Sequence, residues 1–192
     1  LCQEITLPTK PLEHIDDKEG EIALCILSAI NVGILRDLDD LEELCELAVR
    51  ALEEIIDYQR YPIKAAEIST KARRSLGVGY IGLAHYLAKN KAKYNDKEAW
   101  ILTHKLSEAF QYYLLKASNK LAEERGACEY FNRTKYSEGI MPIDTYKKEV
   151  DDIVKEKLYY DWDGLRKSIR EHGLRHSTLS AQMPSESSSV VS

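Results

Sequence analysis

The stretch that most constrains the fold runs from Asp161 to Ser189, where a punctuated helix is followed by a short apolar segment and a serine-rich loop. Asp161 stands at an N-cap position, and Gly173 stands where a left-handed residue ends a helix. Between them, apolar residues recur at helical spacing on one face: Trp162, Leu165 and Ile169. The sequence therefore predicts a helix from 162 to 172.

The residues after this helix predict a strand and then a ligand-binding loop. Ser177 to Ala181 is short and partly apolar, as in a buried strand or strand end. Pro184 then opens a loop of small hydroxyl residues around Glu186. Its unobstructed backbone N–H groups and hydroxyls suit a phosphate. A disordered serine-rich tail is the alternative that composition leaves open.

The order of residues in this stretch carries a resemblance to a known family. The run W-x-x-L-x₇-G-L-R-H-S-T-L-S-A-x-x-P, from Trp162 to Pro184, resembles the signature of the large subunit of ribonucleotide reductase. The sequences of Leu7–Pro11 and Pro142–Lys148 are similar to those of the class I large subunit. The loop resembles that family's substrate-phosphate loop, which implies that four residues bind the diphosphate of a substrate: Ser185, Glu186, Ser187 and Ser188.

A thiol and a carboxylate share one face of the N-terminal segment, because Cys2, Glu4 and Thr6 alternate along an extended chain. This pairing is usable in catalysis, although a frayed terminus with an incidental cysteine has the same pattern. Leu1, Cys2 and Glu4 resemble the family's radical-cysteine tip, Asn-Leu-Cys-x-Glu. The resemblance implies that Cys2 forms a thiyl radical and that Glu4 is a general base.

Cys25 lies in the densely apolar stretch from Glu21 to Leu35, where a cysteine ordinarily packs as a small hydrophobic residue. Its context, A-L-C-x-L-S-A, is similar to that of a redox cysteine in the family. The resemblance implies that Cys25 supplies electrons together with a second cysteine.

Gly77 to Gly82 matches G-x-G-x-x-G, the fingerprint of dinucleotide binding. That motif requires a preceding apolar strand. Here the preceding residues, 67–76, are charged and helix-like, and Tyr80 to Lys91 also has a helical pattern. We therefore expect the glycines to permit close helix packing or a helix break. A dinucleotide-binding protein remains an alternative, and it predicts a strand directly before Gly77.

Three further segments have helical patterns. Leu38 to Tyr58 has a stripe at three- and four-residue steps: Leu41, Leu44, Ala48, Leu52 and Ile55. A long helix is predicted from a cap at Asn95 or Asp96 to Arg125, with Gly126 ending it. Asp144 to Lys157 is charged and predicts a helix with a solvated face. The predicted fold is mostly α within an α/β architecture.

Bulk properties exclude several classes of protein. The chain has 192 residues, 44% of them hydrophobic and 31% charged, and a net charge of −5, so no basic surface indicates nucleic-acid binding. No apolar run suggests a membrane span or a signal peptide, and the four cysteines are widely spaced. We therefore expect a cytoplasmic protein without a membrane or nucleic-acid partner. No histidine spacing indicates a metal site.

The resemblance implies that residues 1–192 are an interior piece of a larger catalytic domain, a ten-stranded α/β barrel with a large helical portion. The finger-loop tip would be 1–11, the helical portion about 38–172, and the phosphate-binding loop 184–189. The implied partners are a ribonucleoside diphosphate, the rest of the large subunit and a radical-generating, metal-bearing small subunit. A thioredoxin- or glutaredoxin-type reductant and ATP or dNTP effectors would serve the parent enzyme, with no cofactor bound by this chain.

A helical interaction module without catalysis is the second alternative. It would explain the amphipathic helices and the acidic balance, and it would make Cys2 incidental. It predicts that alkylating the cysteines leaves the function intact. By the resemblance, in contrast, the chain alone has no turnover, because the remaining parts of the enzyme are missing.

Overall fold

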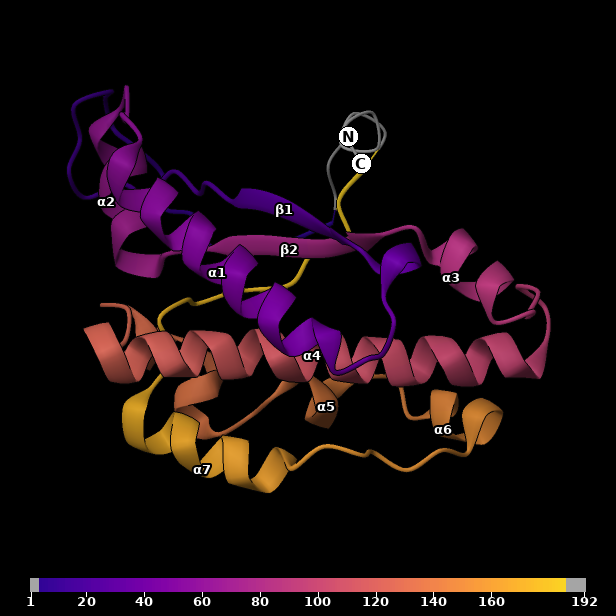
Figure 1. Cartoon of the computed structure of the whole chain (residues 1–192). Coiled ribbons are helices and arrows are strands. Elements are labelled where there is room, and N and C mark those ends of the chain that lie inside the picture. The colour runs from indigo at the N-terminus through magenta and orange to yellow at the C-terminus, as the bar shows by residue number, and fades with distance from the viewer. Residues whose placement is uncertain (1–3, 186–192) are drawn as a thin grey trace.

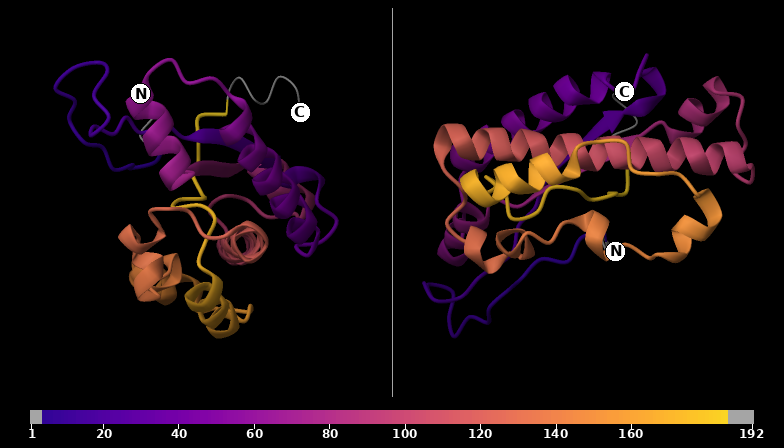
Figure 2. Two further views of the ribbon diagram at one scale, coloured as in Figure 1. Left: turned by 90° about the vertical axis from the view of Figure 1, so that its left-hand side faces the viewer. Right: turned by 90° about the horizontal axis from the view of Figure 1, so that it is seen from below.

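One long helix, α4 (Lys97–Arg125), runs through the middle of the computed structural model, which describes residues 4–185 (Figure 1). A layer with both strands and α1 lies on one side of it, and a layer with α5, α6 and α7 lies on the other. The view along α4 in Figure 2 shows the same arrangement. The described residues are mainly helical with a small open sheet, which confirms the expected balance of helix and strand.

The sheet consists of β1 (Ile26–Asn31) and β2 (Leu76–Ile81), which pair in parallel. On the other edge of β2, Val78 forms a parallel bridge with Ser180. The Val78 N–H donates to the carbonyl of Leu179 at 2.8 Å, and the Ala181 N–H donates to that of Val78 at 3.1 Å. The segment 177–181 thus continues the sheet, as predicted for a strand end.

Two helices connect β1 to β2: α1 (Asp40–Tyr58) and α2 (Lys64–Arg73), after a 3₁₀ turn, η1 (Val32–Ile34). The prediction of a helix ending at Tyr58 is confirmed, but the predicted stripe was partly wrong. Ile55 is 42% exposed, because the helix turns another face toward the core. That face is formed by Leu41, Cys45, Val49, Leu52 and Ile56.

The prediction for α4 is confirmed at both ends, with Asp96 at the N-cap and Gly126 at the C-cap with φ of 85°. On one face of α4, Leu106, Ala109 and Leu121 are buried. Phe110 and Leu115 are buried as well. A helix between two layers is apolar on more than one face, so a single stripe understates its burial.

The C-terminal helix α7 (Trp162–His172) also begins and ends as predicted. The Gly164 N–H donates to the carboxylate of Asp161 at 2.9 Å, and Gly173 has a φ of 78°. Before α7 the chain forms two 3₁₀ turns and two short helices, which are η2 (Phe131–Arg133), η3 (Lys135–Glu138), α5 (Pro142–Thr145) and α6 (Glu149–Val154).

The single helix predicted from Asp144 to Lys157 was wrong. Two short helices stand there, and Lys155 ends α6 in a left-handed conformation with φ of 54°. Val154 is buried, whereas the rest of α6 is exposed, so the segment is solvated apart from one apolar contact. Among residues 4–185, no helix is both long and apolar enough to cross a bilayer.

The G-x-G-x-x-G segment lies mostly within β2, which contains Gly77 and Gly79. The helix predicted from Tyr80 was wrong at its start, because the strand continues to Ile81 and α3 (Leu83–Lys89) follows. The helix-like character of the preceding residues is confirmed by α2. In the dinucleotide fingerprint a complete strand precedes the first glycine. Here Gly77 is the second residue of β2, and the helix α2 comes before it, so the described part of the chain does not have the arrangement that the fingerprint requires.

Candidate active site

Glu4 lines a cavity of about 390 Å³ at the end of β2. The cavity is formed by three parts of the chain: the N-terminal segment, the middle of α4 and the segment that bridges to β2. Its other lining residues are Tyr80, Ser107, Phe110, Gln111, Ser180, Ala181 and Gln182. A half-buried carboxylate in a cavity between rigid elements is a suitable position for acid–base chemistry.

Cys25 lies close enough to Glu4 for the charge of the carboxylate to act on its thiol. Cys25 is half-buried and directly precedes β1. Burial raises the pKa of the Cys25 thiol to about 11, and the negative charge of Glu4 contributes to the increase. The thiol is therefore protonated at neutral pH.

Gly77 is what allows Cys25 to pack against β2. A Cβ atom at Gly77 would lie 2.7 Å from the Cys25 Sγ and 2.5 Å from Cδ2 of Leu27. Gly79 plays the same part for the C-terminal segment, since a Cβ there would meet the carbonyl oxygen of Ala181 and the side chain of Met183. The expected role in helix packing was wrong: these glycines admit the flanking segments to the strand.

The remaining predicted site residues are only partly described. Ser185 follows Pro184 and is half-buried at the end of the described chain. Cys2, Glu186, Ser187 and Ser188 lie outside the described residues, so their assigned roles stay predictions.

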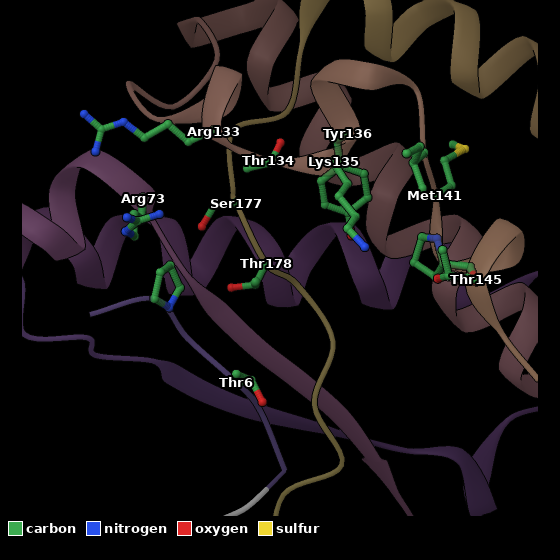
Figure 3. A pocket seen from close by; sticks show the side chains of 13 residues that line it. Thr6, Arg73, Arg133, Thr134, Lys135, Tyr136, Met141, Thr145, Ser177 and Thr178 are labelled. Atoms are coloured by element: carbon green, nitrogen blue, oxygen red, sulfur yellow. Dashed lines mark hydrogen bonds between the residues drawn. The ribbon is translucent and has the colours of Figure 1, made fainter. Parts of the chain in front are cut away.

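A second cavity, of about 540 Å³, adjoins the same two extended segments (Figure 3). Thr6 and Thr178 line it, two residues along each segment from Glu4 and Ser180. Its wall includes two cationic side chains, Arg73 and Arg133, and both pair with Glu21. Nε of Arg73 lies 2.8 Å from the carboxylate of Glu21, and Nη1 of Arg133 lies 3.6 Å from it. One carboxylate thus serves both guanidinium groups.

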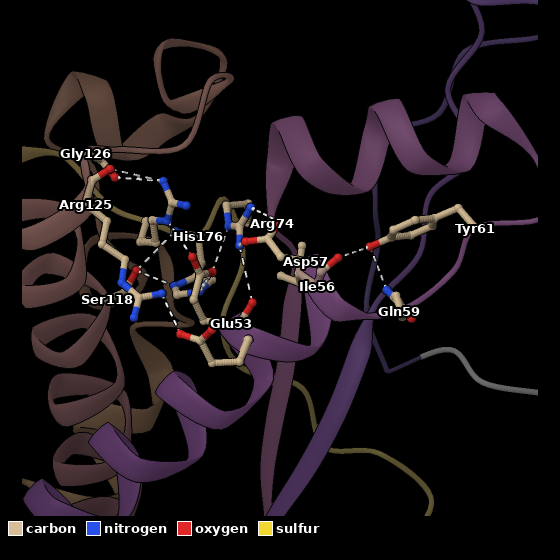
Figure 4. A network of polar contacts seen from close by, with 12 residues as sticks. Glu53, Ile56, Asp57, Gln59, Tyr61, Arg74, Ser118, Arg125, Gly126 and His176 are labelled. Atoms are coloured by element: carbon tan, nitrogen blue, oxygen red, sulfur yellow. Dashed lines mark hydrogen bonds and ion pairs between the residues drawn. The ribbon is translucent and has the colours of Figure 1, made fainter.

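A buried ionic cluster lies at the opposite end of β2 (Figure 4). Glu53, which is fully buried, accepts a hydrogen bond from Arg74 Nε at 2.8 Å and from Arg175 Nε at 2.6 Å. His176 Nε2 lies 3.0 Å from the same carboxylate, and its Nδ1 lies 2.9 Å from the hydroxyl of Ser118. The cluster ties α1, α4 and the start of the C-terminal segment together.

The electrostatics of this cluster keep Glu53 ionised and His176 neutral. Burial alone would raise the pKa of Glu53, but hydrogen bonds from His176, Arg74 and Arg175 outweigh it and lower the pKa from 4.5 to about 2. Burial lowers the pKa of His176 below 6.5. A neutral imidazole facing a carboxylate carries its proton on Nε2, so Nδ1 accepts from Ser118.

Sequence reasoning missed this cluster. The available signal was the spacing of Glu53, which stands four residues after Val49 and three before Ile56 on the buried face of α1. A glutamate in that register requires partners, and nothing in the sequence said which residues would provide them.

The other two described cysteines lie in the interior. Cys45 and Cys128 are buried, and burial raises the pKa of Cys45 to about 12 and that of Cys128 to about 11. Within residues 4–185, no three His, Cys, Asp or Glu side chains are grouped so that they could hold a metal ion.

Comparison with known proteins identifies the family of the chain. The family model for the barrel domain of ribonucleotide reductase matches residues 1–192, so the chain belongs to the ribonucleotide reductase family. The chain is 62% identical over its full length to the ribonucleoside-diphosphate reductase subunit alpha of Haemophilus influenzae, and 61% identical to the ribonucleoside-diphosphate reductase 1 subunit alpha of Escherichia coli. The corresponding protein of Enterobacteria phage T4 is 47% identical over 194 residues. The chain spans 25% of the length of each of these relatives.

Proposed function

We propose that this chain is the part of a class I ribonucleoside-diphosphate reductase large subunit that carries the radical cysteine, its general base and one redox cysteine. The observation that carries the proposal is the convergence of Glu4, Cys25 and the Ser180–Ser185 segment on β2. These residues come from both ends of the chain, and the resemblance implies a role in the family's reaction for Glu4, Cys25 and Ser185.

In the proposed reaction, Cys2 as a thiyl radical abstracts the 3′ hydrogen atom of a ribonucleoside diphosphate. The S–H bond that forms is close in strength to the C–H bond that breaks, so the step is reversible. Glu4 takes the proton of the 3′-hydroxyl as general base. Cys25 and a second cysteine close to a disulfide and supply two electrons and two protons: one proton leaves with the 2′-hydroxyl as water, and the other hydrogen replaces that hydroxyl at C2′. The hydrogen atom on Cys2 then returns to C3′ and Glu4 returns its proton to the 3′ oxygen, which restores the thiyl radical.

The diphosphate would be held by Ser185, Glu186, Ser187 and Ser188 with their backbone N–H groups. The half-buried position of Ser185, beyond the segment that lies along β2, supports a loop near the Glu4 cavity. Electrons would be restored by a thioredoxin- or glutaredoxin-type reductant, and the radical would come from a metal-bearing small subunit.

The proposed architecture of the parent is the ten-stranded α/β barrel with residues 1–11 as the tip of its finger loop, 38–172 as its helical portion and 184–189 as its phosphate loop. Parallel pairing of β1 with β2, and the parallel bridge at Ser180, support a larger parallel sheet. Parallel sheets have helices on their faces, as α1 and α4 are arranged here.

The test is dNDP formation from a ribonucleoside diphosphate, with the small subunit and a dithiol reductant present. The full-length large subunit that contains this chain should form product, and the 192-residue chain alone should form none. Product from the isolated chain would overturn the proposed division of the active site. Absence of product from the full-length subunit would overturn the proposed activity.

A further inference from the structure

Two side chains in the Glu4 cavity have buried polar atoms without a hydrogen-bond partner among the described residues. One atom is Oε2 of Glu4, an acceptor, and the other is Nε2 of Gln111, a donor. A buried polar atom left without a partner is destabilising. An unpaired donor and an unpaired acceptor on the walls of one cavity fit a ligand group that accepts from the first and donates to the second.

The side chain of Gln111 is held so that its amide nitrogen is left for such a ligand. The hydroxyl of Ser180 donates to Oε1 of Gln111 at 2.8 Å. Ser180 itself is fixed by its bridge to Val78, and Gln111 stands in the middle of α4, which is packed on two sides. Donors fixed in this way need no reorganisation when a ligand arrives.

A hydroxyl group is the smallest group that satisfies both atoms, because it is a donor and an acceptor at once. The cavity of about 390 Å³ falls within the size range of sites for small molecules and leaves room for a sugar ring. A carboxylate ligand would be repelled by Glu4, and an ammonium group has no acceptor for the Gln111 amide.

We propose that Gln111 binds the same substrate hydroxyl as Glu4, donating its Nε2–H to the hydroxyl oxygen while the hydroxyl donates its proton to Glu4. This inference rests on the proposed function, in which that group is the 3′-hydroxyl of a ribonucleoside diphosphate. As the proton passes to Glu4, the hydroxyl O–H bond breaks, a carboxyl O–H bond forms, and negative charge grows on the substrate oxygen. The amide donor stabilises that charge. Because it is neutral, it does so without neutralising Glu4.

The test uses the full-length subunit and two probes, cytidine diphosphate and its 3′-deoxy analogue. Gln111→Met keeps the length of the side chain and removes its polar atoms. We expect this variant to bind cytidine diphosphate roughly tenfold more weakly than the wild type and the 3′-deoxy analogue equally well. Its kcat for reduction should fall as well. Gln111→Asn, which withdraws the donor by one methylene, should show the same selective loss and serves if the methionine variant is insoluble.

Gln59→Met is the matched control, because Gln59 donates to Tyr61 at 2.7 Å, at the end of α1 and away from the cavity. It should bind both probes as the wild type does. The inference would be overturned if Gln111→Met weakened the binding of both probes equally or of neither. In that case, reduction by the wild-type subunit would still support the proposed function. If the wild-type subunit forms no dNDP, the proposed function itself fails, and the inference fails with it.

Discussion

Two glutamates near opposite ends of β2 have contrasting surroundings. Glu53 is fully buried, and its carboxylate has hydrogen bonds from Arg74, Arg175 and His176. Glu4 lines an open cavity, and its Oε2 is buried without a partner among the described residues. The carboxylate of Glu53, whose hydrogen bonds are satisfied, connects segments of the fold, whereas that of Glu4 has an oxygen left to accept a hydrogen bond, as the proposed function requires.

The largest expected effect is on turnover, at Cys25 near Glu4. Cys25→Ser in the full-length subunit should abolish repeated turnover, because a serine hydroxyl cannot form the disulfide that supplies two electrons. Cys45→Ala is the control, since Cys45 is buried in the core away from Glu4; it should lower stability and leave turnover intact. The measurement is dNDP formed per subunit with excess reductant. Wild-type turnover by Cys25→Ser would contradict the assignment.

The second expected effect is at the buried cluster around Glu53, where acidification should lower the free energy of unfolding. The folded-state pKa of Glu53 is lowered from 4.5 to about 2, so its contribution is complete above pH 4.5 and is lost as pH falls toward 2. That loss amounts to about 3 kcal/mol. His176 also has a lowered pKa, so the folded state disfavours its protonation, and stability should begin to decrease below pH 6.5.

Urea unfolding of the chain at a series of pH values measures this dependence. His176→Gln keeps a donor for Glu53 and removes the imidazole, so it should eliminate the decrease near pH 6.5 and keep the one below pH 4.5. A wild-type unfolding free energy that is constant from pH 7 to pH 3 would show that the cluster is not linked to folding.

A smaller effect is expected at the strand between the two ends. Gly77→Ala places a Cβ 2.7 Å from the Cys25 Sγ, and overpacking of this kind costs about 1–3 kcal/mol. The double variant with Cys25→Ala should recover part of the loss, because one of the two clashing groups is then absent. If the changes in unfolding free energy caused by the two single substitutions add up to that of the double variant, Gly77 and Cys25 do not interact.

The smallest effect is expected next to Glu53 on the exposed face of α1. Glu54 pairs with Arg125 at 2.6 Å, but the two side chains are 63% and 42% exposed. Glu54→Gln should therefore change the unfolding free energy by less than about 1 kcal/mol. A loss as large as that from Glu53→Gln would remove the distinction between buried and exposed carboxylates in this helix.

The helices could largely be predicted from sequence, because capping residues and apolar spacing are local signals. Asp161 and Gly173 mark the two ends of α7, and Gly126 ends α4. The face of α1 could not be assigned reliably, because two overlapping stripes satisfy helical spacing and only tertiary packing selects between them.

The strands and the site depended on long-range contacts that a local pattern does not encode. The lack of a side chain at Gly77 of β2 allows Cys25 and the C-terminal segment to approach the strand closely. Neither of them is near Gly77 in the sequence. The alternation of Cys2 and Glu4 indicated a usable pairing, but only the family resemblance favoured a catalytic role for Glu4 and for Cys25. Gln111 carried no sequence signal at all. Its role is proposed from an unpaired amide nitrogen in a cavity.

The most direct test of the contrast is to measure turnover and unfolding on Glu4→Gln and Glu53→Gln in the same full-length subunit. Glu4→Gln should reduce kcat by about 10²–10⁴-fold with no loss of stability. Glu53→Gln should lower the unfolding free energy by about 3–5 kcal/mol, and the protein that remains folded should retain turnover. Wild-type turnover by Glu4→Gln, or full stability of Glu53→Gln, would contradict the account.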